Sequence, residues 1–531
     1  MSLKARFAPS PTGQVHIGNI RTAIFNYLFT RHNKGEFLLR IEDTDLERST
    51  KQAIDALFAC MQWLGMDYDG VPMYQTSQSG HHLETAKLLE EKGLAYKLDA
   101  AEEKSPLYFR LDYFCDSFPF IKETGEAQIV LDETAPLKLS RSGLLYFTIS
   151  AKGKSVENAG CLAGFKDLKV LDKEGKELFA FTEEKVKEIW NLVEPLTIEG
   201  AAKLLFTRRE VFFEDMVKGH LAKPLDSIKD LVIVRSDGSP VFHLANVCDD
   251  ITQSVSHIVR GDDHVENTFR HLFLFQALGA QIPTYAHLPM IVNASGKPYS
   301  KRDGDAFVGD FKEKGFLPQA LFNYLALLGW SPGDNREKMS MEEMIEAFHI
   351  ERAQRTPAQF DIMKLANMNG HYIAEMPFAE FEEAIWDFAG RFPYRANAER
   401  ALFRKVAELM QSRTKLFTDC EAWNYFFEKP VQYDAKGMKK FMGTAEQRNA
   451  LNEIREAFSS WEGPEDLEAI EAVIRKAEEK ASIGHGKLNQ SVRVAVTGTT
   501  VGAGICETLA ILGLAESAQR IAAALAMEMP A

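Results

Sequence analysis

The pattern of apolar and polar residues changes period several times in the first hundred residues. Residues 5–8 and 35–42 are short, largely apolar runs typical of buried strands. Residues 20–31 and 49–64 instead carry apolar side chains at helical spacing. Strands and helices that alternate in this order predict a parallel sheet with crossover helices.

A different pattern begins near residue 98 and continues to about residue 208. Short strand candidates and charged turns dominate there, with one isolated helix expected near 183–193. We interpret this stretch as a module inserted into the α/β domain. The α/β pattern then resumes, and residues 230–235 and 241–244 flank a Ser-Asp-Gly-Ser sequence that predicts a β-hairpin.

From residue 317 to its end the chain has a mostly helical pattern. A helix is expected over 319–328, and Pro464 with the acids that follow it predicts the start of another. The pattern therefore predicts an α/β region divided by an insertion, followed by an all-α region.

Composition narrows the class of protein. The chain has 531 residues, 45% hydrophobic and 26% charged, which is typical of a globular protein with several domains. Neither a signal peptide nor the ~18 apolar residues of a membrane span is present, so we expect a cytoplasmic protein. The six cysteines form no C-x-x-C pair, which argues against a disulfide framework and a zinc site. A net charge of −14 argues against a protein covered in nucleic acid, although it does not exclude a local basic groove that binds nucleic acid.

Residues Pro9–Asn19 lie between the first predicted strand and the first predicted helix. Ligands bind in such a crevice of a doubly wound sheet, and the free N–H groups of a helix start attract phosphate. His16 could donate to a phosphate oxygen, and Gly18 would let a flat ring approach the backbone. A proline-stiffened loop without a ligand explains this segment alone equally well.

Two further segments carry charge. Ser295–Gly304 is a loop with three cations, which could close over a polyphosphate, although a solvated basic loop is the commoner meaning of such a run. In Arg40–Asp45, strand alternation places Arg40 and Glu42 on one face, where the acid could hold an ammonium group. Helix capping by the residues that follow is compatible with that role.

Taken together, these segments resemble class I aminoacyl-tRNA synthetases, and bacterial glutamyl-tRNA synthetases in particular. Arg6–Gly13 with His16–Asn19 resembles the opening and HIGH motif of that family, and Pro298–Arg302 resembles its KMSKS-type loop. The matching segments elsewhere are Arg40–Asp45, Asp249-Asp250, Ile258–His264, Leu317–Leu321 and Asn323–Ser331. Several motifs in one order are far more specific than any single motif.

The resemblance implies a Rossmann-like doubly wound parallel sheet split by an insertion, with a helical anticodon-binding region behind it. The expected domains are the first catalytic half (1–97), an inserted acceptor-end-binding module (98–208), the second catalytic half with the KMSKS-type loop (209–304), a stem-contact helical domain (305–376) and a helical anticodon-binding domain (377–531).

The resemblance also implies a ligase of protein biosynthesis. It would join L-glutamate to ATP as glutamyl-adenylate and pass the glutamyl group to the terminal adenosine of tRNA(Glu). The implied glutamate-binding residues are Arg6, Ala8, Ser10, Glu42, Phe242, Asn246 and Arg260. The implied ATP-binding residues are His16, Gly18, Asp263, Ile291 and Lys301, and those expected to act in catalysis are His16, Ser300, Lys301 and Arg302. Mg²⁺ is expected with ATP, and Arg413 is expected to read the anticodon.

Some positions depart from the family pattern. Asn19 replaces the second histidine of HIGH, and Pro298 replaces the first lysine of the KMSKS-type loop. Phe242 stands where a tyrosine is expected, and one lost hydrogen bond costs on the order of 0.5–1.5 kcal/mol. The insertion lacks the cysteines that bind zinc in some relatives, so no zinc site is expected.

These departures leave alternatives open. The chain could also charge tRNA(Gln), or it could be a catalytically impaired paralogue that binds RNA. The preserved Arg6, His16, Glu42, Arg260 and Lys301 favour an active enzyme. The family resemblance leads us to expect a monomer.

Overall fold

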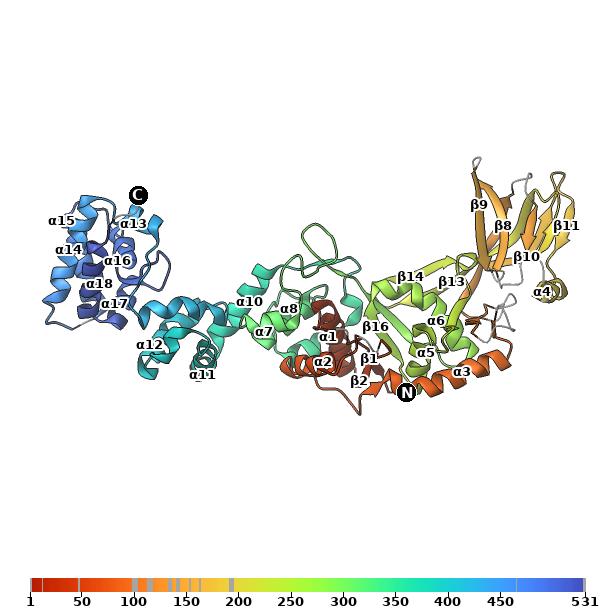
Figure 1. The fold of residues 1–531 in the computed structure, drawn as a ribbon, viewed down its shortest axis with the longest axis horizontal. Coiled ribbons are helices and arrows are strands. Elements are labelled where there is room, and N and C mark those ends of the chain that lie inside the picture. Colours follow the sequence, from red (N-terminus) through yellow and green to blue (C-terminus); the bar gives the residue numbers. More distant parts are fainter. Residues whose placement is uncertain are drawn as a thin grey trace. The chain divides into compact units, whose positions relative to one another are not determined.

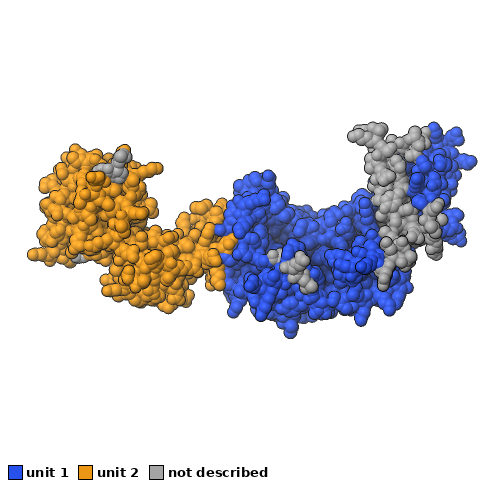
Figure 2. Space-filling view, viewed as in Figure 1, with its two compact units in different colours: residues 1–309, 325–360 blue, residues 310–324, 361–531 orange. Residues whose placement is uncertain are grey.

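The computed structural model describes residues 2–11, 13–45, 48–97, 104–111, 118–131, 136–139, 144–151, 154–161, 164–190, 195–464 and 466–528. The chain forms two compact units (Figure 2). Unit 1 comprises residues 1–309 and 325–360, and unit 2 comprises 310–324 and 361–531.

Unit 1 is built on parallel strands in the order β3-β2-β1-β16-β17 (Figure 1). The strands are β1 (Lys4–Phe7), β2 (Glu36–Ile41), β3 (Met73–Tyr74), β16 (His257–Gly261) and β17 (Thr284–Leu288). The helices connected to them are α1 (Ile17–His32), α2 (Lys51–Trp63), α3 (Ser79–Glu91), α5 (Phe242–Thr252) and α6 (Val265–Ala277). The predicted α/β start is confirmed, and β1 lies between β2 and β16, which creates the switch point where ligands bind.

One long strand joins the insertion to this sheet. β13 (Lys203–Asp215) pairs antiparallel with β6 (Ile121–Val130) and reaches β17 in parallel through Asp215 opposite Tyr285. The sheet is therefore mixed, and the expected boundary at 208/209 falls within a continuous strand. The expected boundary at residue 98 lies outside the described residues.

The remaining elements of the insertion and its surroundings are mostly short strands, as expected. They are β4 (Ala95–Lys97), β5 (Leu107–Phe109), β7 (Leu137–Leu139), β8 (Leu144–Ala151), β9 (Lys154–Cys161), β10 (Phe165–Leu171), β11 (Glu177–Ala180), α4 (Glu183–Trp190), β12 (Leu196–Ile198), β14 (Gly219–Pro224) and β15 (Leu231–Val234). The expected helix near 183–193 is α4, and residues 191–193 lie outside the described part of the chain.

The predicted hairpin is wrong in its second half. The turn forms, because the Arg235 N–H donates to Ser239 O at 2.9 Å and Val241 N–H donates to Ile233 O at 2.9 Å. The chain becomes helical at the next residue, where α5 begins, rather than continuing as a strand over 241–244. A window of four residues does not distinguish a strand from a buried helix, and the helix wins because it packs its apolar face in the core.

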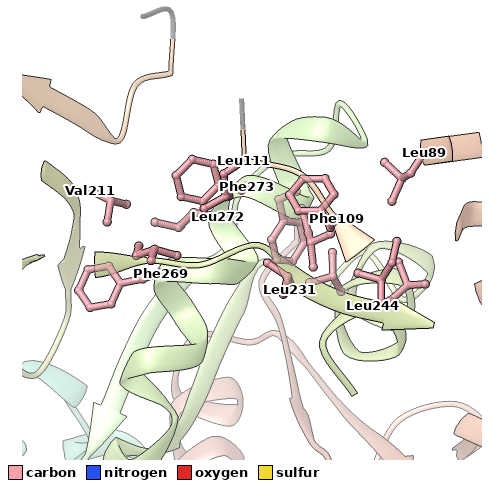
Figure 3. Close-up of a cluster of buried hydrophobic side chains, with 14 of the residues drawn as sticks. Leu89, Phe109, Leu111, Val211, Leu231, Leu244, Phe269, Leu272 and Phe273 are labelled. Carbon is pink, nitrogen blue, oxygen red and sulfur yellow. The ribbon is translucent and has the colours of Figure 1, made fainter. Parts of the chain in front are cut away.

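The core of this part of unit 1 brings together residues from both sides of the insertion. Leu89 of α3 and Phe109 of β5 pack with Leu244 of α5 and Phe273 of α6 (Figure 3). All four side chains are buried. Burial of a large apolar side chain stabilises the fold by about 1.5–3 kcal/mol, so this shared core holds α5 and α6 in place beside the sheet.

The short elements that complete unit 1 are β18 (Ile291–Val292), α9 (Met341–Ala347) and β19 (Ala358–Gln359). Two further helices, α7 (Val308–Glu313) and α8 (Pro318–Leu327), cross the divisions between the units in the sequence. The helix expected over 319–328 is α8.

Unit 2 is helical, as expected, and has two apolar cores. Its other helices are α10 (Ile362–Glu375), α11 (Phe378–Ala389), α12 (Arg400–Met410), α13 (Ala435–Phe441), α14 (Ala445–Ser459), α15 (Leu467–Lys480), α16 (Leu488–Thr497), α17 (Ile505–Leu512) and α18 (Leu514–Ala526). Asp466 caps α15 by accepting a hydrogen bond from the Ala469 N–H, so the acid before this helix has the role its position suggests.

Among the described residues, no single helix is both long and apolar enough to cross a membrane, and α17 with α18 reaches that length and hydropathy only as a pair bent by 108°.

We predict that two glycines at the ends of turns in unit 2 respond differently to alanine. Gly498 ends α16 with φ at +74°, and an added Cβ would lie 2.6 Å from the Gln432 carbonyl oxygen. Gly486 has φ at +77° but nothing within 4 Å of such a Cβ. Gly486→Ala should lower the free energy of unfolding by about 1 kcal/mol through backbone strain, and Gly498→Ala by distinctly more. Urea unfolding of both variants checks this, and equal losses would contradict the role of the close approach.

Candidate active site

A cavity of about 670 Å³ opens in unit 1 where β1, β2 and β16 end. It lies at the carboxyl ends of parallel strands, the expected position for a ligand in such a sheet. The structure brings most of the sequence-predicted residues to its lining, namely Arg6, Ala8, Ser10, His16, Gly18, Glu42, Phe242, Asn246, Arg260, Asp263 and Ile291.

His16 is the residue that precedes α1 and caps it. Its Nδ1 accepts a hydrogen bond of 3.0 Å from the Gly18 N–H. Burial lowers the pKa of His16 below its ordinary value, so the imidazole is neutral at pH 7 and can accept this bond. A hydrogen bond between the ring and the Tyr299 backbone opposes this shift, so His16 is held by the basic loop as well as by α1.

The segment around His16 pairs with the segment that follows the basic loop. The Ile17 N–H donates to Ala306 O at 2.9 Å, and the Val308 N–H donates to Val15 O at 3.0 Å. The Phe307 ring meets the His16 ring edge-on, with centroids 6.0 Å apart. Two motifs almost 300 residues apart in sequence are thereby joined by backbone hydrogen bonds.

The basic loop reaches the cavity through Pro298 and Tyr299, whereas Ser300, Lys301 and Arg302 do not line it. Lys301 is exposed, and its Nζ lies 5.8 Å from the centroid of the Phe307 ring. Asp303 holds the loop by accepting hydrogen bonds of 2.9 Å from both the N–H and the hydroxyl of Ser300. The lysine therefore lies next to a residue that contacts His16, on a loop that is also held by hydrogen bonds from Asn293 Nδ2 to Asp303 Oδ1 at 2.7 Å and from the Tyr299 N–H to Ile291 O at 2.9 Å.

A buried network of charges surrounds Glu42. Its Oε1 accepts from Asn246 Nδ2 at 2.8 Å and from Arg40 Nη2 at 3.3 Å. Arg40 also donates to Asp250 at 2.6 Å, and Arg6 Nε donates to the same carboxylate at 2.8 Å. Burial raises the pKa of Glu42 although Arg40 opposes the shift. Burial would also raise the pKa of Asp250, but the two guanidinium groups lower it below its usual range.

Arg40 has a third carboxylate beside it, that of Asp249, which is held from another side. Asp249 accepts from Gln75 Nε2 at 2.8 Å and lies 2.7 Å from His82 Nε2. Its Oδ2 is 3.9 Å from Arg40 Nε. These contacts connect β2, α3 and α5 behind the cavity, and Asn246 and Asp250 belong to the same helix.

Arg260 is bound differently from Arg6. Its Nη2 donates to Thr268 Oγ1 at 2.7 Å and to His264 O at 3.3 Å, and its Nε donates to His287 Nε2 at 3.3 Å. All three acceptors are uncharged. Burial lowers the pKa of Arg260 to about 10, so the guanidinium remains charged at pH 7.

Phe242 and Asp263 occupy the same side of the cavity. The Phe242 ring stacks on the His264 ring at 6.0 Å and 28°. Asp263 folds back over Gly261, where a Cβ would lie 2.4 Å from its Oδ1, so glycine is required at this position for the carboxylate to sit there. Arg413 lies in unit 2, and its Nη1 donates to Leu409 O at 3.0 Å.

Sequence reasoning missed several lining residues, of which Arg21 is the most distinctive. It is buried, and it donates to Pro289 O and, at 3.4 Å, to Leu328 O. It lies three residues after Gly18 on α1, which places both on one helix face, and this spacing was the available signal. Other lining residues not predicted as site residues are Asn19, Thr22, His264, Asn267 and Tyr299. In the described part of the chain, no three His, Cys, Asp or Glu side chains gather as a metal site.

Comparison with family models divides the chain into two matched regions. A model of the class I tRNA synthetases (E and Q), catalytic domain, matches residues 2–105 and 176–367. A model of an anticodon binding domain matches residues 377–525. The unmatched residues 106–175 fall within the predicted insertion.

Curated relatives and solved structures agree with these matches. The glutamate–tRNA ligase of Francisella philomiragia subsp. philomiragia is 34% identical over 515 residues, 96% of each chain. That of Bradyrhizobium sp. (strain ORS 278) is 35% identical over 532 residues, 98% of this chain and 97% of the relative. The crystal structure of a glutamate tRNA ligase from Elizabethkingia meningosepticum in complex with its amino acid has a TM-score of 0.70 and 26% identity, covering 99% of both chains. With a catalytic-domain match over more than half its length and relatives of this identity along nearly all of it, the chain belongs to the glutamate–tRNA ligase family of class I tRNA synthetases.

Proposed function

We propose that this chain joins L-glutamate to tRNA(Glu) in two steps. The α-carboxylate of glutamate attacks the α-phosphorus of ATP, and pyrophosphate leaves. A ribose hydroxyl of the terminal adenosine then attacks the glutamyl carbonyl, and AMP leaves. The observation that supports this best is the single cavity in which two arginines and Glu42 lie beside the start of α1.

The amino-acid end of this cavity has complementary charges for glutamate. Arg260 holds the side-chain carboxylate, because its planar, permanently charged fork suits a carboxylate. Arg6, Ser10 and the backbone of Ala8 line the same pocket, and Phe242 closes it with an apolar ring. Glu42, kept in position by Asn246, accepts the α-ammonium group.

The nucleotide end uses the start of α1 and the basic loop. His16 and Gly18 meet the phosphates, Asp263 the ribose and the Ile291 backbone the adenine. Lys301, supported by Ser300 and Arg302, moves onto the phosphates as negative charge develops. Mg²⁺ would be held mainly by the ATP phosphates, as is usual for this ion, and would offset their charge. The chain's own residues then contribute positioning and electrostatics, with no covalent nucleophile.

The proposed domains follow the expected boundaries. The insertion 98–208 would contact the acceptor end, residues 305–376 the stem, and residues 377–531 the anticodon, with Arg413 as a reader. Sequence-specific reading of RNA targets unstacked loop bases, which an arginine on a short exposed segment can reach. A monomer located in the cytoplasm, and charging of tRNA(Gln), stay predictions.

Charging assays test the proposed function directly. Purified protein with ATP and Mg²⁺ should attach radiolabelled glutamate to tRNA(Glu) and exchange pyrophosphate into ATP. The same assay with tRNA(Gln) decides whether the enzyme is discriminating. Retained binding of tRNA without exchange or charging would instead support the impaired paralogue.

Lys301→Ala should lower kcat for pyrophosphate exchange by roughly 10²–10³-fold, the usual effect of removing one group that stabilises developing charge. The KM for glutamate should change little, because the ammonium acts mainly in the transition state. Lys297→Ala is the matched control, since it removes an exposed lysine from the same loop. Equal losses in both variants would show that only the total charge of the loop matters.

Glu42 should make glutamate binding depend on pH. Because burial raises its pKa, Glu42 takes up a proton at a higher pH than an ordinary glutamate does, and its attraction for ammonium is lost as pH falls through that raised value. The KM for glutamate should therefore rise on acidification, while Glu42→Gln should have a high KM with no such rise. Steady-state kinetics at a series of pH values measures both, with the KM for ATP as the internal control. A wild-type KM for glutamate that is flat with pH would refute this role.

A further inference from the structure

Three buried residues form a line of hydrogen bonds behind the cavity, beginning at the end of β13. Asp215 Oδ2 lies 2.7 Å from His287 Nδ1, and His287 Nε2 accepts from Arg260 Nε at 3.3 Å. The Thr268 hydroxyl lies 3.0 Å from the same Nε2 and accepts from Arg260 Nη2 at 2.7 Å, so it connects the two side chains a second time. The exposed fractions are 4% for Asp215, 0% for His287 and 6% for Arg260. Only Arg260 lines the cavity, so the other two act on a ligand only through it.

The acid determines which nitrogen of His287 carries the proton. A carboxylate only accepts hydrogen bonds, so Nδ1 of His287 must donate to Asp215. In a neutral imidazole, Nε2 is then the nitrogen without a proton, and it accepts from both Arg260 Nε and the Thr268 hydroxyl. Burial lowers the pKa of His287 although Asp215 opposes the shift, and this favours the neutral ring.

Asp215 is itself fixed by the backbone. Its Oδ1 accepts from the Val217 N–H at 2.9 Å and the Lys218 N–H at 2.8 Å, and its Oδ2 accepts from the His287 N–H at 3.1 Å. Burial would raise the pKa of Asp215, but the hydrogen bonds from His287 and Lys218 lower it, so it stays ionised. The imidazole of His287 thus separates the negative charge of Asp215 from the guanidinium of Arg260.

The two arginines of the glutamate pocket therefore have different electrostatic surroundings. Arg6 donates directly to the Asp250 carboxylate, which offsets its charge. Arg260 instead donates to three neutral acceptors, and none of its hydrogen bonds within the described part of the chain reaches a carboxylate. A buried guanidinium without a direct counter-ion attracts a carboxylate ligand strongly.

We propose that His287 is a positioning residue that orients the Arg260 guanidinium while leaving its positive charge available to the side-chain carboxylate of glutamate, with Asp215 fixing the tautomer. This inference rests on the proposed role of Arg260 in glutamate binding. A carboxylate in place of His287 would orient the arginine as well, but would neutralise it. The neutral ring is therefore the feature that selects for an anionic substrate side chain.

An isosteric pair of variants tests this inference. His287→Gln keeps a neutral acceptor near Nε2, and His287→Glu puts a charge of nearly the same shape there. In pyrophosphate exchange with tRNA(Glu) present, His287→Gln should keep a KM for glutamate close to wild type. His287→Glu should raise the KM for glutamate by about 100-fold, because its carboxylate would pair with the guanidinium of Arg260 that glutamate needs. The KM for ATP should stay unchanged. Similar KM values for glutamate in both variants would overturn the inference.

A second arm separates failure of this inference from failure of the proposed function. His287→Leu should raise the KM for glutamate by about 10-fold in the wild type but add nothing in an Arg260→Ala background, because the coupling acts through that arginine. If Arg260→Ala leaves the KM for glutamate unchanged, the proposed role of Arg260 is wrong. If Arg260→Ala raises it and His287→Leu raises it equally in both backgrounds, His287 acts elsewhere and the inference is wrong. Thermal unfolding and circular dichroism of every variant identify loss of fold, and His287→Gln remains the folded comparison.

Discussion

The site depends on the pairing of buried charges at the ends of β1 and β2. Moving a charged group out of water costs several kcal/mol unless an opposite charge and hydrogen bonds replace the water. Arg6, Arg40, Glu42 and Asp250 meet this condition together, since each contacts at least one opposite charge in the group. Because Asp250 lies on α5, the same contacts fix that helix against the sheet. Loss of Asp250 would remove the ion pair of Arg6 and one of the ion pairs of Arg40, so the pocket and the fold share one constraint.

Arg260 differs from these paired charges, because it does not hydrogen-bond to a carboxylate of the described residues. Its acceptors are a hydroxyl, a backbone carbonyl and an imidazole nitrogen, none of which cancels its charge. The wall of the cavity thus combines one arginine whose charge is offset within the protein and another whose charge is directed to the ligand. Such a division suits the proposed substrate, because Arg260 can pair with the side-chain carboxylate of glutamate and Glu42 with its ammonium group.

The nucleotide end relies on geometry more than on burial. Backbone hydrogen bonds join Val15 and Ile17 to residues 306–308, so the start of α1 and the end of the basic loop move as one piece. Lys301 lies outside this joined segment and is exposed, which leaves its side chain able to change position. A hydrogen-bonded helix start next to an exposed cation suits the proposed phosphate chemistry, because the charge to be stabilised appears only during the reaction.

Local patterns in the sequence were enough to find most elements, whereas the resemblance to a known family supplied most of the predicted cavity residues. Strands at 5–8 and 35–42, the helices after them and the helical rear half follow from periodicity, which depends on neighbours a few residues apart. The strand at 241–244 was wrong because the core packing of Leu244 decides between strand and helix there. Likewise, Arg6 and Asp250 are 244 residues apart, and His287 and Asp215 are 72 apart, so nothing in their local sequence indicates that they meet. The sequence alone therefore determined which chemical groups are available, whereas only the tertiary structure decided which charges are cancelled and which remain free, because that depends on contacts made by packing distant strands together.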